Sequence, residues 1–316
     1  MALKVVALAG GVGGAKLADG LAACLQPEEL TIIVNTGDDF THLGLQISPD
    51  LDTVIYTLAG LADPERGWGR VDESWNFLAT LGELGGPTWF RLGDRDLALH
   101  HARTLRRGSG EPLSAITRDL RERLGIKHSI LPMTDDQVQT IVSTQEGDIP
   151  FQEYFVARRC EPVVKGFSFM GAENAQPAPG VLQSLDTADL VIFCPSNPWV
   201  SLDPILGIPG IRPAVMQKHV YMISPIIAGT TVRGPAAKMY AEMGIDPSAL
   251  AVAQHFKDLL KGIVIDAQDA NLTPDIEALG IRVSNDQILM QTRDDRIRLA
   301  QSLLHFSNSV PVKESN

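Results

Sequence analysis

The sequence has no hydrophobic run long enough to cross a membrane, and it is poor in cysteine. Charges, glycine or proline interrupt every apolar stretch before the ~18 residues that a membrane span needs. The three cysteines, Cys24, Cys160 and Cys194, stand far apart and form no Cys-x-x-Cys pair. These absences argue against a membrane protein and against a disulfide framework, and we expect a cytoplasmic protein with reduced, buried thiols.

Basic residues are in deficit, with 27 Lys and Arg against 38 Asp and Glu and a net charge of −11. A surface of this sign repels a phosphate backbone, so we expect no nucleic-acid partner. The sequence also lacks a serine nucleophile elbow, a Cys–His nucleophile pair, a His-Glu-x-x-His motif and the His/Cys spacing of a zinc site. Covalent and zinc-dependent catalysis therefore have no support.

One segment near the start resembles a lipoprotein processing site: Leu21–Cys24, with Lys4 as a basic residue upstream. A signal peptide needs an unbroken apolar stretch of about 7–15 residues. Lys16 and Asp19 interrupt that stretch here. We therefore expect no secretory leader.

Short apolar runs alternate with amphipathic stretches. Continuous Val/Ile/Leu runs are typical of parallel strands covered on both faces, so we predict a Rossmann-like, doubly wound α/β fold with a mainly parallel sheet. The strands are expected at Val5–Leu8, Thr31–Val34, Leu190–Cys194, His219–Ser224 and Gly262–Ile265. The helices are expected at Lys16–Leu25, Asp52–Leu61, Asp94–Leu105, Leu113–Leu124, Gly234–Met243 and Thr292–His305.

We expect the chain, residues 1–316, to form one nucleotide-binding domain. The segment from about 63 to 178 is richer in Arg, Trp and loop-like sequence, which predicts a mostly helical insert or cap over the sheet. Val312–Asn316 is predicted to be a frayed tail.

The first strand runs directly into a glycine-rich turn that contains Gly11, Gly13, Gly14 and Lys16. Glycines let the backbone approach an anion, and the N–H groups of the following helix would point at it. The turn lacks the ending of a P-loop, and Lys16 stands where a Gly-x-Gly-x-x-Gly fingerprint needs its third glycine. The sequence predicts a phosphate site, with a tight turn that binds no ligand as the alternative.

Two acidic clusters follow strand ends: Asn35–Asp39, with Asp38 and Asp39, and Ser48–Thr53, with Asp50 and Asp52. Ligands of an open parallel sheet bind beyond the carboxyl ends of its strands, and Mg²⁺ takes one or two carboxylates beside phosphate oxygens. We therefore predict a magnesium site here. Alternatively, Asp38 and Asp39 form a turn, and Asp50 or Asp52 caps a helix.

Further candidates lie in four segments. Arg91, just before Leu92–His100, could bind a phosphate or a ring carbonyl; the alternative is a capped helix with Arg95 and Asp96 solvated. The adjacent His100 and His101 diverge by about 100° on a helix and cannot share a metal.

The segments Pro195–Trp199 and Ser224–Gly229 offer compact polar groups to a base or ribose, or form ordinary turns. Thr230–Pro235 opens a helix and is a further candidate phosphate contact.

Together these motifs resemble the 2-phospho-L-lactate transferase family, which makes the deazaflavin coenzyme F-420. The likeness runs from about Lys4 to about Phe306, and the motifs keep the family's order. The segments that carry it are Gly10–Lys16, Asn35–Asp39, Ser48–Thr53, Leu92–Asp96, Leu131–Asp136, Pro195–Pro198 and Ser224–Ile227.

The resemblance implies a Mg²⁺-dependent reaction between two partners. The acceptor would be 7,8-didemethyl-8-hydroxy-5-deazariboflavin (Fo), and the donor a guanosine diphosphate ester that carries a lactyl or enolpyruvyl group. The ribityl hydroxyl of Fo would attack the phosphorus that bears this group, and GMP would leave. The resemblance also implies a homodimer.

The resemblance assigns roles by position. Asp38 or Asp39, with Asp50 and Asp52, would hold Mg²⁺ or orient the hydroxyl, and Asp50 and Asp52 are the predicted catalytic pair. The other predicted binding residues are Gly11, Gly13 and Gly14 for the diphosphate, Arg91 and Asp94 for Fo, Ser196 and Asn197 for guanosine, and Lys16, Asn35 and Pro198 beside them.

Two other functions remain open at this point. Some members of the wider superfamily resemble nucleotide-sugar-binding regulatory proteins, which share the glycine turn without the transferase chemistry. A nicotinamide oxidoreductase would use Asp38 to hold a ribose, although the missing third glycine argues against it. Trp68, Trp75 and Trp89 either line a deazaflavin pocket or pack in the core.

Overall fold

Seven parallel strands form the central sheet of the computed structural model, which describes residues 3–232 and 234–308. Their order is β14-β13-β10-β9-β1-β2-β5. The strands are β1 (Val5–Ala9), β2 (Leu30–Val34), β5 (Ser129–Pro132), β9 (Leu190–Phe193), β10 (His219–Ile223), β13 (Leu260–Asp266) and β14 (Arg282–Asp286). The chain starts in the middle of the sheet, builds one half, and then returns to build the other, so the predicted doubly wound α/β fold is confirmed.

The five predicted strands are present, whereas β5 and β14 were missed. Both missed strands lie at the edges of the sheet, where a strand has one neighbour. Strand β14 is mostly polar and half-buried, and β5 is short and ends in a proline. An edge strand needs no continuous apolar run, so the pattern that identified the central strands is absent.

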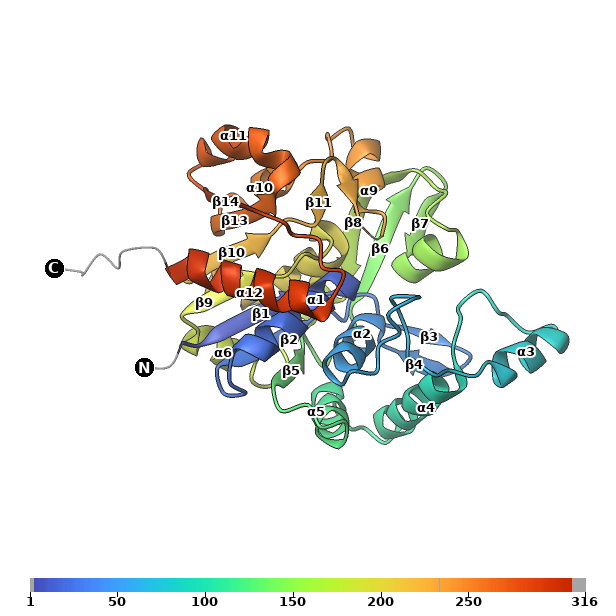
Figure 1. Ribbon diagram of the computed structural model, residues 1–316. Helices are drawn as coiled ribbons and strands as arrows, with labels where there is room; N and C mark the ends of the chain where they lie inside the picture. Colours follow the sequence, from blue (N-terminus) through green and yellow to red (C-terminus); the bar gives the residue numbers. More distant parts are fainter. Residues whose placement is uncertain (1–2, 233, 309–316) are drawn as a thin grey trace.

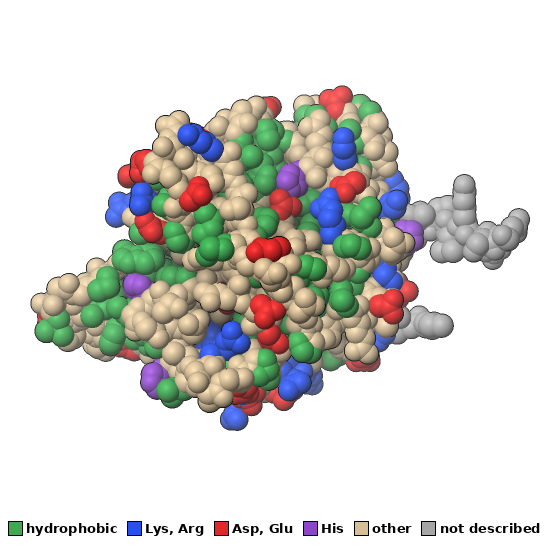
Figure 2. Space-filling view, turned by 180° about the vertical axis from the view of Figure 1, so that it is seen from behind, with side chains coloured by type: hydrophobic (Ala, Val, Ile, Leu, Met, Phe, Trp, Pro, Cys, Tyr) green, Lys and Arg blue, Asp and Glu red, His purple; other side chains and the backbone are tan. Residues whose placement is uncertain are grey.

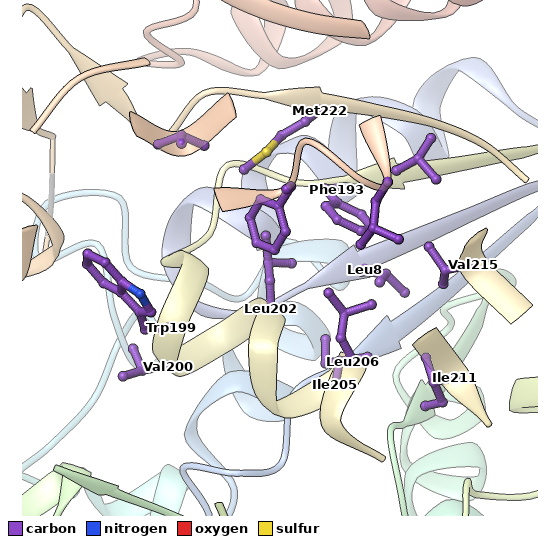
Figure 3. Close-up of a cluster of buried hydrophobic side chains, with 14 of the residues drawn as sticks. Leu8, Phe193, Trp199, Val200, Leu202, Ile205, Leu206, Ile211, Val215 and Met222 are labelled. Atoms are coloured by element: carbon purple, nitrogen blue, oxygen red, sulfur yellow. The ribbon is translucent and has the colours of Figure 1, made fainter. Parts of the chain in front are cut away.

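Side chains of the central strands alternate between two buried clusters, one on each face of the sheet. Val5, Ala7 and Ala9 pack into the cluster that contains side chains of α1 and α12, whereas Val6 and Leu8 pack into the opposite cluster. Figure 3 shows part of the latter, where Leu8, Phe193 and Met222 of three adjacent strands meet Leu202, Ile205 and Leu206. The sheet is therefore a buried layer between two layers of helices, as continuous apolar strands require.

The helices divide between the two faces (Figure 1), and α1 and α12 lie side by side. The first face carries α1 (Gly11–Cys24), α2 (Pro49–Leu58), α4 (Asp94–Gly108), α5 (Leu113–Arg123) and α12 (Arg293–Asn308). The second carries α6 (Val181–Thr187), α7 (Asp203–Gly207), α8 (Ile211–Met216), α9 (Ala236–Glu242), α10 (Ala249–His255) and α11 (Thr273–Glu277). Short π and 3₁₀ segments are η1 (Glu153–Ala157), η2 (Ala172–Asn174), η3 (Pro198–Leu202) and η4 (Ala267–Leu272).

Two helices begin earlier than predicted, and both differences concern the candidate site. Helix α1 begins at Gly11 rather than Lys16, so the glycines belong to its first turn. Helix α2 begins at Pro49, a residue suited to the first helical position, and its N-cap is Ser48. Asp50 and Asp52 therefore lie inside the first turn of α2, and neither is its N-cap residue.

The segment from 63 to 178 is more than a helical insert. It begins with a projection that carries α3 (Asn76–Glu83) and continues into α4 and α5 (Figure 1). Strand β5 then joins the central sheet beside β2. A separate antiparallel sheet follows, in the order β7-β6-β8. The strands outside the central sheet are β3 (Phe40–His42), β4 (Leu45–Ile47), β6 (Gln139–Thr144), β7 (Gly147–Pro150), β8 (Val164–Met170), β11 (Ile226–Ile227) and β12 (Thr230–Thr231).

Within the residues that the structure describes, none of the helices combines the length and the apolar character that a membrane span requires. The predicted tail Val312–Asn316 lies outside the described residues, as does Arg233 of the Thr230–Pro235 segment.

Candidate active site

A cavity of ≈ 690 Å³ opens at the carboxyl ends of the parallel strands. It is lined by the turn after β1 and by the loops after β9, β10 and β14. The order of the strands reverses between β1 and β9, so the cavity lies at the topological switch point of the sheet. The fold thus places a cavity where open α/β sheets bind their ligands.

The glycine turn brings the first turn of α1 against the loop after β9. A Cβ on Gly13 would lie 2.3 Å from the carbonyl oxygen of Pro195, and one on Gly14 would lie 2.6 Å from Ser196 Oγ. Ser196 Oγ accepts a hydrogen bond from the Gly10 N–H (3.0 Å) and donates one to the Gly10 carbonyl (2.8 Å). Gly11 and Gly13 line the cavity. The glycines therefore permit close packing as well as access to the backbone at the cavity.

Asp50 of α2 lies against the glycine turn and is held there by two hydrogen bonds. Its Oδ1 accepts a hydrogen bond from the Gly11 N–H (2.7 Å), and its Oδ2 accepts one from Asn35 Nδ2 (2.9 Å). Burial raises the pKa of Asp50 to about 6, although both hydrogen bonds oppose the shift. Asn35 is fully buried behind Asp50 and also donates to the Val200 carbonyl (3.1 Å). It orients Asp50 and does not line the cavity.

Asp38 and Asp39 lie in the turn between β2 and β3, close to Asp50. Burial raises the pKa of both carboxyls well above the ordinary value, and the neighbouring charge of Asp50 adds to the shift of Asp38. Ser48 Oγ donates to Asp39 Oδ2 (2.6 Å). The Oδ1 atoms of Asp38 and Asp39 are buried without a hydrogen-bond partner among the described residues. Crowded, buried carboxylate oxygens of this kind fit a hard divalent cation, which would relieve their repulsion.

No three His, Cys, Asp or Glu side chains of residues 3–232 and 234–308 are grouped so that they alone could hold a metal ion. Mg²⁺ commonly uses one or two protein carboxylates and completes its octahedron with water and phosphate oxygens. Asp38 and Asp50 both line the cavity and could supply these two carboxylates.

Asp52 lines the cavity but is already paired. Both of its carboxylate oxygens accept hydrogen bonds from the guanidinium of Arg103, one of them over 3.0 Å. The side chains are 7% and 2% exposed, respectively, so this is a buried salt bridge. His100 Nδ1 lies 3.5 Å from Asp52 Oδ2. Asp52 therefore has a structural partner that the sequence did not reveal, and its geometry favours Asp38 and Asp50 as the residues that would hold a cation.

A second buried group continues from Asp52 along α4. Tyr56 donates its hydroxyl proton to Asp96 Oδ1 (2.5 Å), and His100 Nε2 lies 3.3 Å from the same oxygen. Burial tends to raise the pKa of Asp96, but the contacts with His100, Tyr56 and Arg103 outweigh it and lower this pKa. The alternative that Asp96 is solvated is wrong. The i, i+4 and i+7 spacing of Asp96, His100 and Arg103 was a detectable signal for one shared helix face.

Aromatic side chains form another part of the cavity lining, which we call the aromatic wall. Trp68, Trp89 and Phe90 line the cavity together with Arg91. Trp68 is 38% exposed and Trp89 37%, so these two side chains belong to the cavity rather than to the core. The guanidinium carbon of Arg91 lies 4.7 Å from the ring centroid of Trp75. This geometry orients Arg91 through a cation–π contact.

Asp94 does not line this cavity. Its carboxylate instead accepts hydrogen bonds at the start of α3, from Ser74 Oγ (2.6 Å) and from the N–H groups of Asn76 and Phe77 (3.1 Å each). The hydrogen bond from Ser74 and those from the α3 turn lower the pKa of Asp94. The structure thus places Asp94 outside the cavity, at the junction of α3 and α4.

Some polar groups of the loop after β9 form hydrogen bonds within the protein. Asn197 Oδ1 accepts from the Trp199 N–H (3.0 Å) and caps η3, while its Nδ2 donates to Met239 Sδ (3.4 Å). Ser196 and Asn197 still line the cavity, whereas Pro198 is buried and does not. Lys16 also lines the cavity and donates from Nζ to the Met290 carbonyl (2.6 Å). This contact joins α1 to the segment after β14.

A second cavity of ≈ 610 Å³ adjoins the first. The two share Asp38, Trp89, Phe151 and Gln152, and the second also contains Asp39 and Glu153. Asp38 therefore stands between two spaces, one lined by the glycine turn and aromatic rings and one rich in polar side chains.

The fold and site define a doubly wound α/β protein with its ligand cavity at the topological switch point. The family model described as 2-phospho-L-lactate transferase CofD matches residues 5–297. The chain belongs to this family, whose members are transferases of coenzyme F-420 biosynthesis. The resemblance seen in the sequence is confirmed, and the chain is a transferase rather than a regulatory binding protein or a nicotinamide oxidoreductase.

Relatives with curated names support the same assignment. A phosphoenolpyruvate transferase of Streptomyces griseus is 42% identical over 98% of this chain and 99% of its own length. One from Thermobifida fusca is 47% identical over 85% of this chain and 88% of its own. A 2-phospho-L-lactate transferase of Methanopyrus kandleri is 40% identical over 97% and 98%. A crystal structure of a UPF0052 family protein from Bacillus halodurans matches with a TM-score of 0.63 at 14% identity, over 96% of this chain and 99% of that one, and shows a shared fold.

Proposed function

We propose that this protein transfers a phosphoenolpyruvyl or 2-phospholactyl group from a guanosine diphosphate ester to Fo. The terminal ribityl oxygen of Fo forms a bond to the phosphorus that carries the enolpyruvyl or lactyl group. The bond from that phosphorus to the bridging oxygen of the diphosphate breaks, and the bridging oxygen leaves with GMP. The products are a phosphodiester of Fo and GMP, and the hydroxyl proton passes to a base.

The observation that carries this proposal is that one cavity combines two unlike sets of lining groups. The first set is the first turn of α1, whose dipole and N–H groups suit a diphosphate, with Asp38 and Asp50. The second set is Trp68, Trp89 and Phe90, whose faces suit a planar tricyclic ring. We place the donor at the first turn of α1 and Fo against the aromatic wall, with Arg91 beside the ring.

We assign Mg²⁺ binding to Asp38 and Asp50, with Asp39 nearby. A bound Mg²⁺ would neutralise charge on the diphosphate and on the leaving GMP. In the absence of a cation, burial raises the pKa of Asp38, Asp39 and Asp50. We infer that whichever of these carboxylates does not contact Mg²⁺ accepts the hydroxyl proton. Asn35 and Gly11 fix the orientation of Asp50 through their hydrogen bonds.

The remaining parts of the proposal rest on the family resemblance. Ser196 and Asn197 would contact the guanosine of the donor. The active form would be a homodimer in the cytoplasm. Neither part alters the reaction proposed for a single cavity.

The test is a titration of the purified protein with Fo, followed by the fluorescence of the deazaflavin, with and without GDP and Mg²⁺. We expect saturable binding that GDP and Mg²⁺ strengthen. Protein that binds GDP but not Fo would contradict the proposal and favour a nucleotide-binding function without transfer.

A turnover assay with synthetic donors then identifies the transferred group. We expect the enolpyruvyl ester to be preferred, because a relative named phosphoenolpyruvate transferase is 47% identical to this chain whereas one named 2-phospho-L-lactate transferase is 40% identical. Mass spectrometry of the Fo product distinguishes the two esters. Faster turnover of the lactyl ester would reverse this preference and leave the reaction class intact.

A further inference from the structure

The projection at residues 63–93 supplies part of the aromatic wall but has little core of its own. It carries Trp68 and Arg91 to the cavity, yet α3 at its tip contains no buried residue. Figure 2 shows hydrophobic side chains gathered on this projecting lobe, and Phe77 (44%) and Leu84 (81%) are among the exposed ones. Trp89 and Phe90 pack against Phe40 and His42 of β3. The tip of the projection has no such apolar packing, so polar contacts must contribute to its placement.

Two carboxylates join the base of the projection to α4. Glu73, which precedes α3, accepts hydrogen bonds from the start of α4, and Asp94 of α4 accepts hydrogen bonds from the start of α3. Glu73 Oε2 accepts from the Arg95 N–H (2.8 Å), and Glu73 Oε1 accepts from the Asp96 N–H (2.9 Å). Asp94, the first residue of α4, accepts in turn from Ser74 Oγ and from the first N–H groups of α3. Each carboxylate satisfies N–H donors that a helix end otherwise leaves unpaired.

The backbone between the two carboxylates is equally constrained. The Asp94 N–H donates to the Ser74 carbonyl (2.9 Å). A Cβ on Gly93 would lie 2.3 Å from the carboxyl carbon of Glu73, so the close approach needs glycine at this position. We call the contacts of Glu73 and Asp94 the reciprocal cap.

The reciprocal cap lies next to two groups that belong to the cavity lining, Arg91 on one side and the Asp96–Tyr56 pair on the other. Arg91 precedes Asp94 by three residues, and its guanidinium lies over Trp75, the residue between Ser74 and Asn76. The Asp96 N–H donates a hydrogen bond to Glu73, and the Asp96 carboxylate accepts one from the Tyr56 hydroxyl, which lines the cavity. Loss of either carboxylate would therefore remove part of the contacts that position the Trp75–Arg91 pair and the start of α4.

We propose that Glu73 and Asp94 are positioning residues, which fix the aromatic wall and Arg91 so that the cavity accepts a planar ring substrate. The inference rests on the proposed function insofar as that ring is Fo. Neither carboxylate touches the ring. Both act through the placement of Trp68, Trp75 and Arg91.

The test compares four variants, Glu73→Ala, Asp94→Ala, Glu73→Gln and Asp94→Asn. We expect each alanine variant to raise the Kd for Fo about tenfold, while kcat and the KM for the donor stay within about twofold. The amide variants keep an accepting oxygen and should weaken Fo binding less. Glu83→Gln, an exposed carboxylate at the other end of α3, is the matched control and should bind Fo as the native protein does.

Two outcomes overturn the inference: unchanged Fo affinity in both alanine variants, or a parallel loss of kcat, donor binding and thermal stability that marks a purely structural role. Hydrogen exchange at the amides of Asn76, Phe77, Arg95 and Asp96 provides a readout that does not depend on Fo. Faster exchange in the alanine variants supports the reciprocal cap even if the native protein binds no Fo, which would refute the proposed function alone. Unchanged exchange refutes the cap.

Discussion

Asp50 shows how one residue is set by opposing forces. Burial favours its protonated form, and the donors Gly11 and Asn35 favour its carboxylate. The result is a pKa of about 6, above the ordinary 3.8. In the absence of a cation the folded protein therefore keeps this proton to higher pH than the unfolded chain. As pH rises from about 4 to about 6, the unfolded state loses its proton first, so this group reduces the stability of the fold over that window.

Ligand binding should show the opposite dependence on pH. A cation and its diphosphate need Asp50 as a carboxylate, so we expect affinity for GDP with Mg²⁺ to fall up to tenfold per pH unit below about pH 6. Calorimetric titration between pH 5 and 8 measures this. Asp50→Asn should bind weakly at every pH and lose the inflection. An inflection that persists in that variant would assign the titration to another group.

Asp52 and Arg103 form a buried pair in which each charge depends on the other. Removal of one partner leaves a buried, uncompensated charge, which typically costs 3–5 kcal/mol. We expect Arg103→Met and Asp52→Asn each to lower the free energy of unfolding by about that amount, measured by urea denaturation. The double variant Asp52→Leu/Arg103→Met should recover much of the loss.

The same variants separate two roles of Asp52. If Asp52→Asn unfolds at the native urea concentration but loses activity, the carboxylate acts on the ligand rather than on Arg103. If Arg103→Met, Asp52→Asn and the double variant are all as stable as the native protein, the salt bridge does not stabilise the fold.

At the scale of elements, the approach of α1 to the loop after β9 is the feature most sensitive to substitution. Gly13→Ala would place a methyl group 2.3 Å from a backbone carbonyl oxygen, which cannot move aside as a flexible side chain can. Overpacking of this kind typically costs 1–3 kcal/mol. We expect Gly13→Ala to lower the free energy of unfolding by about 1–3 kcal/mol and to weaken GDP binding.

Gly108→Ala is the matched control, because Gly108 also lies in a helix but a methyl group added there would meet open space. This substitution should leave stability unchanged or raise it by up to about 1 kcal/mol, through helix propensity alone. Gly13→Ala with native stability and native GDP affinity would show that α1 tolerates a wider separation from the loop than this packing suggests.

At the scale of the whole molecule, strand order decides where the site lies. The chain returns across β1 after β5, so the loops after β1 and β9 mark the topological switch point of the sheet, and both line the cavity. Residues from Gly10 to Met290 meet there, although most of the chain separates them in sequence. The UPF0052 protein keeps this fold at 14% identity, so strand order and layer packing persist while side chains change.

Part of the site was visible in the sequence because local patterns report it. The glycine turn, the aspartate clusters and Arg91 each follow a strand or precede a helix, and the sheet brings Asp38, Asp50 and Arg91 to one cavity. Arg103, His100 and Tyr56 were not predicted as one group, because their contacts join α2 to α4. Asp94 was predicted to bind the ligand, and only its contacts with α3 reveal the cap.

The sequence by itself determined the fold class, the core strands and the positions of the polar loops, because periodicity and glycine placement act over a few residues. The tertiary structure alone decided which carboxylates are free and which are paired. Asp50 and Asp52 stand two residues apart on α2, yet one accepts an N–H of α1 at the cavity and the other is bound by Arg103 of α4. That difference arises from which helices pack against each side of α2, and a linear pattern does not record it.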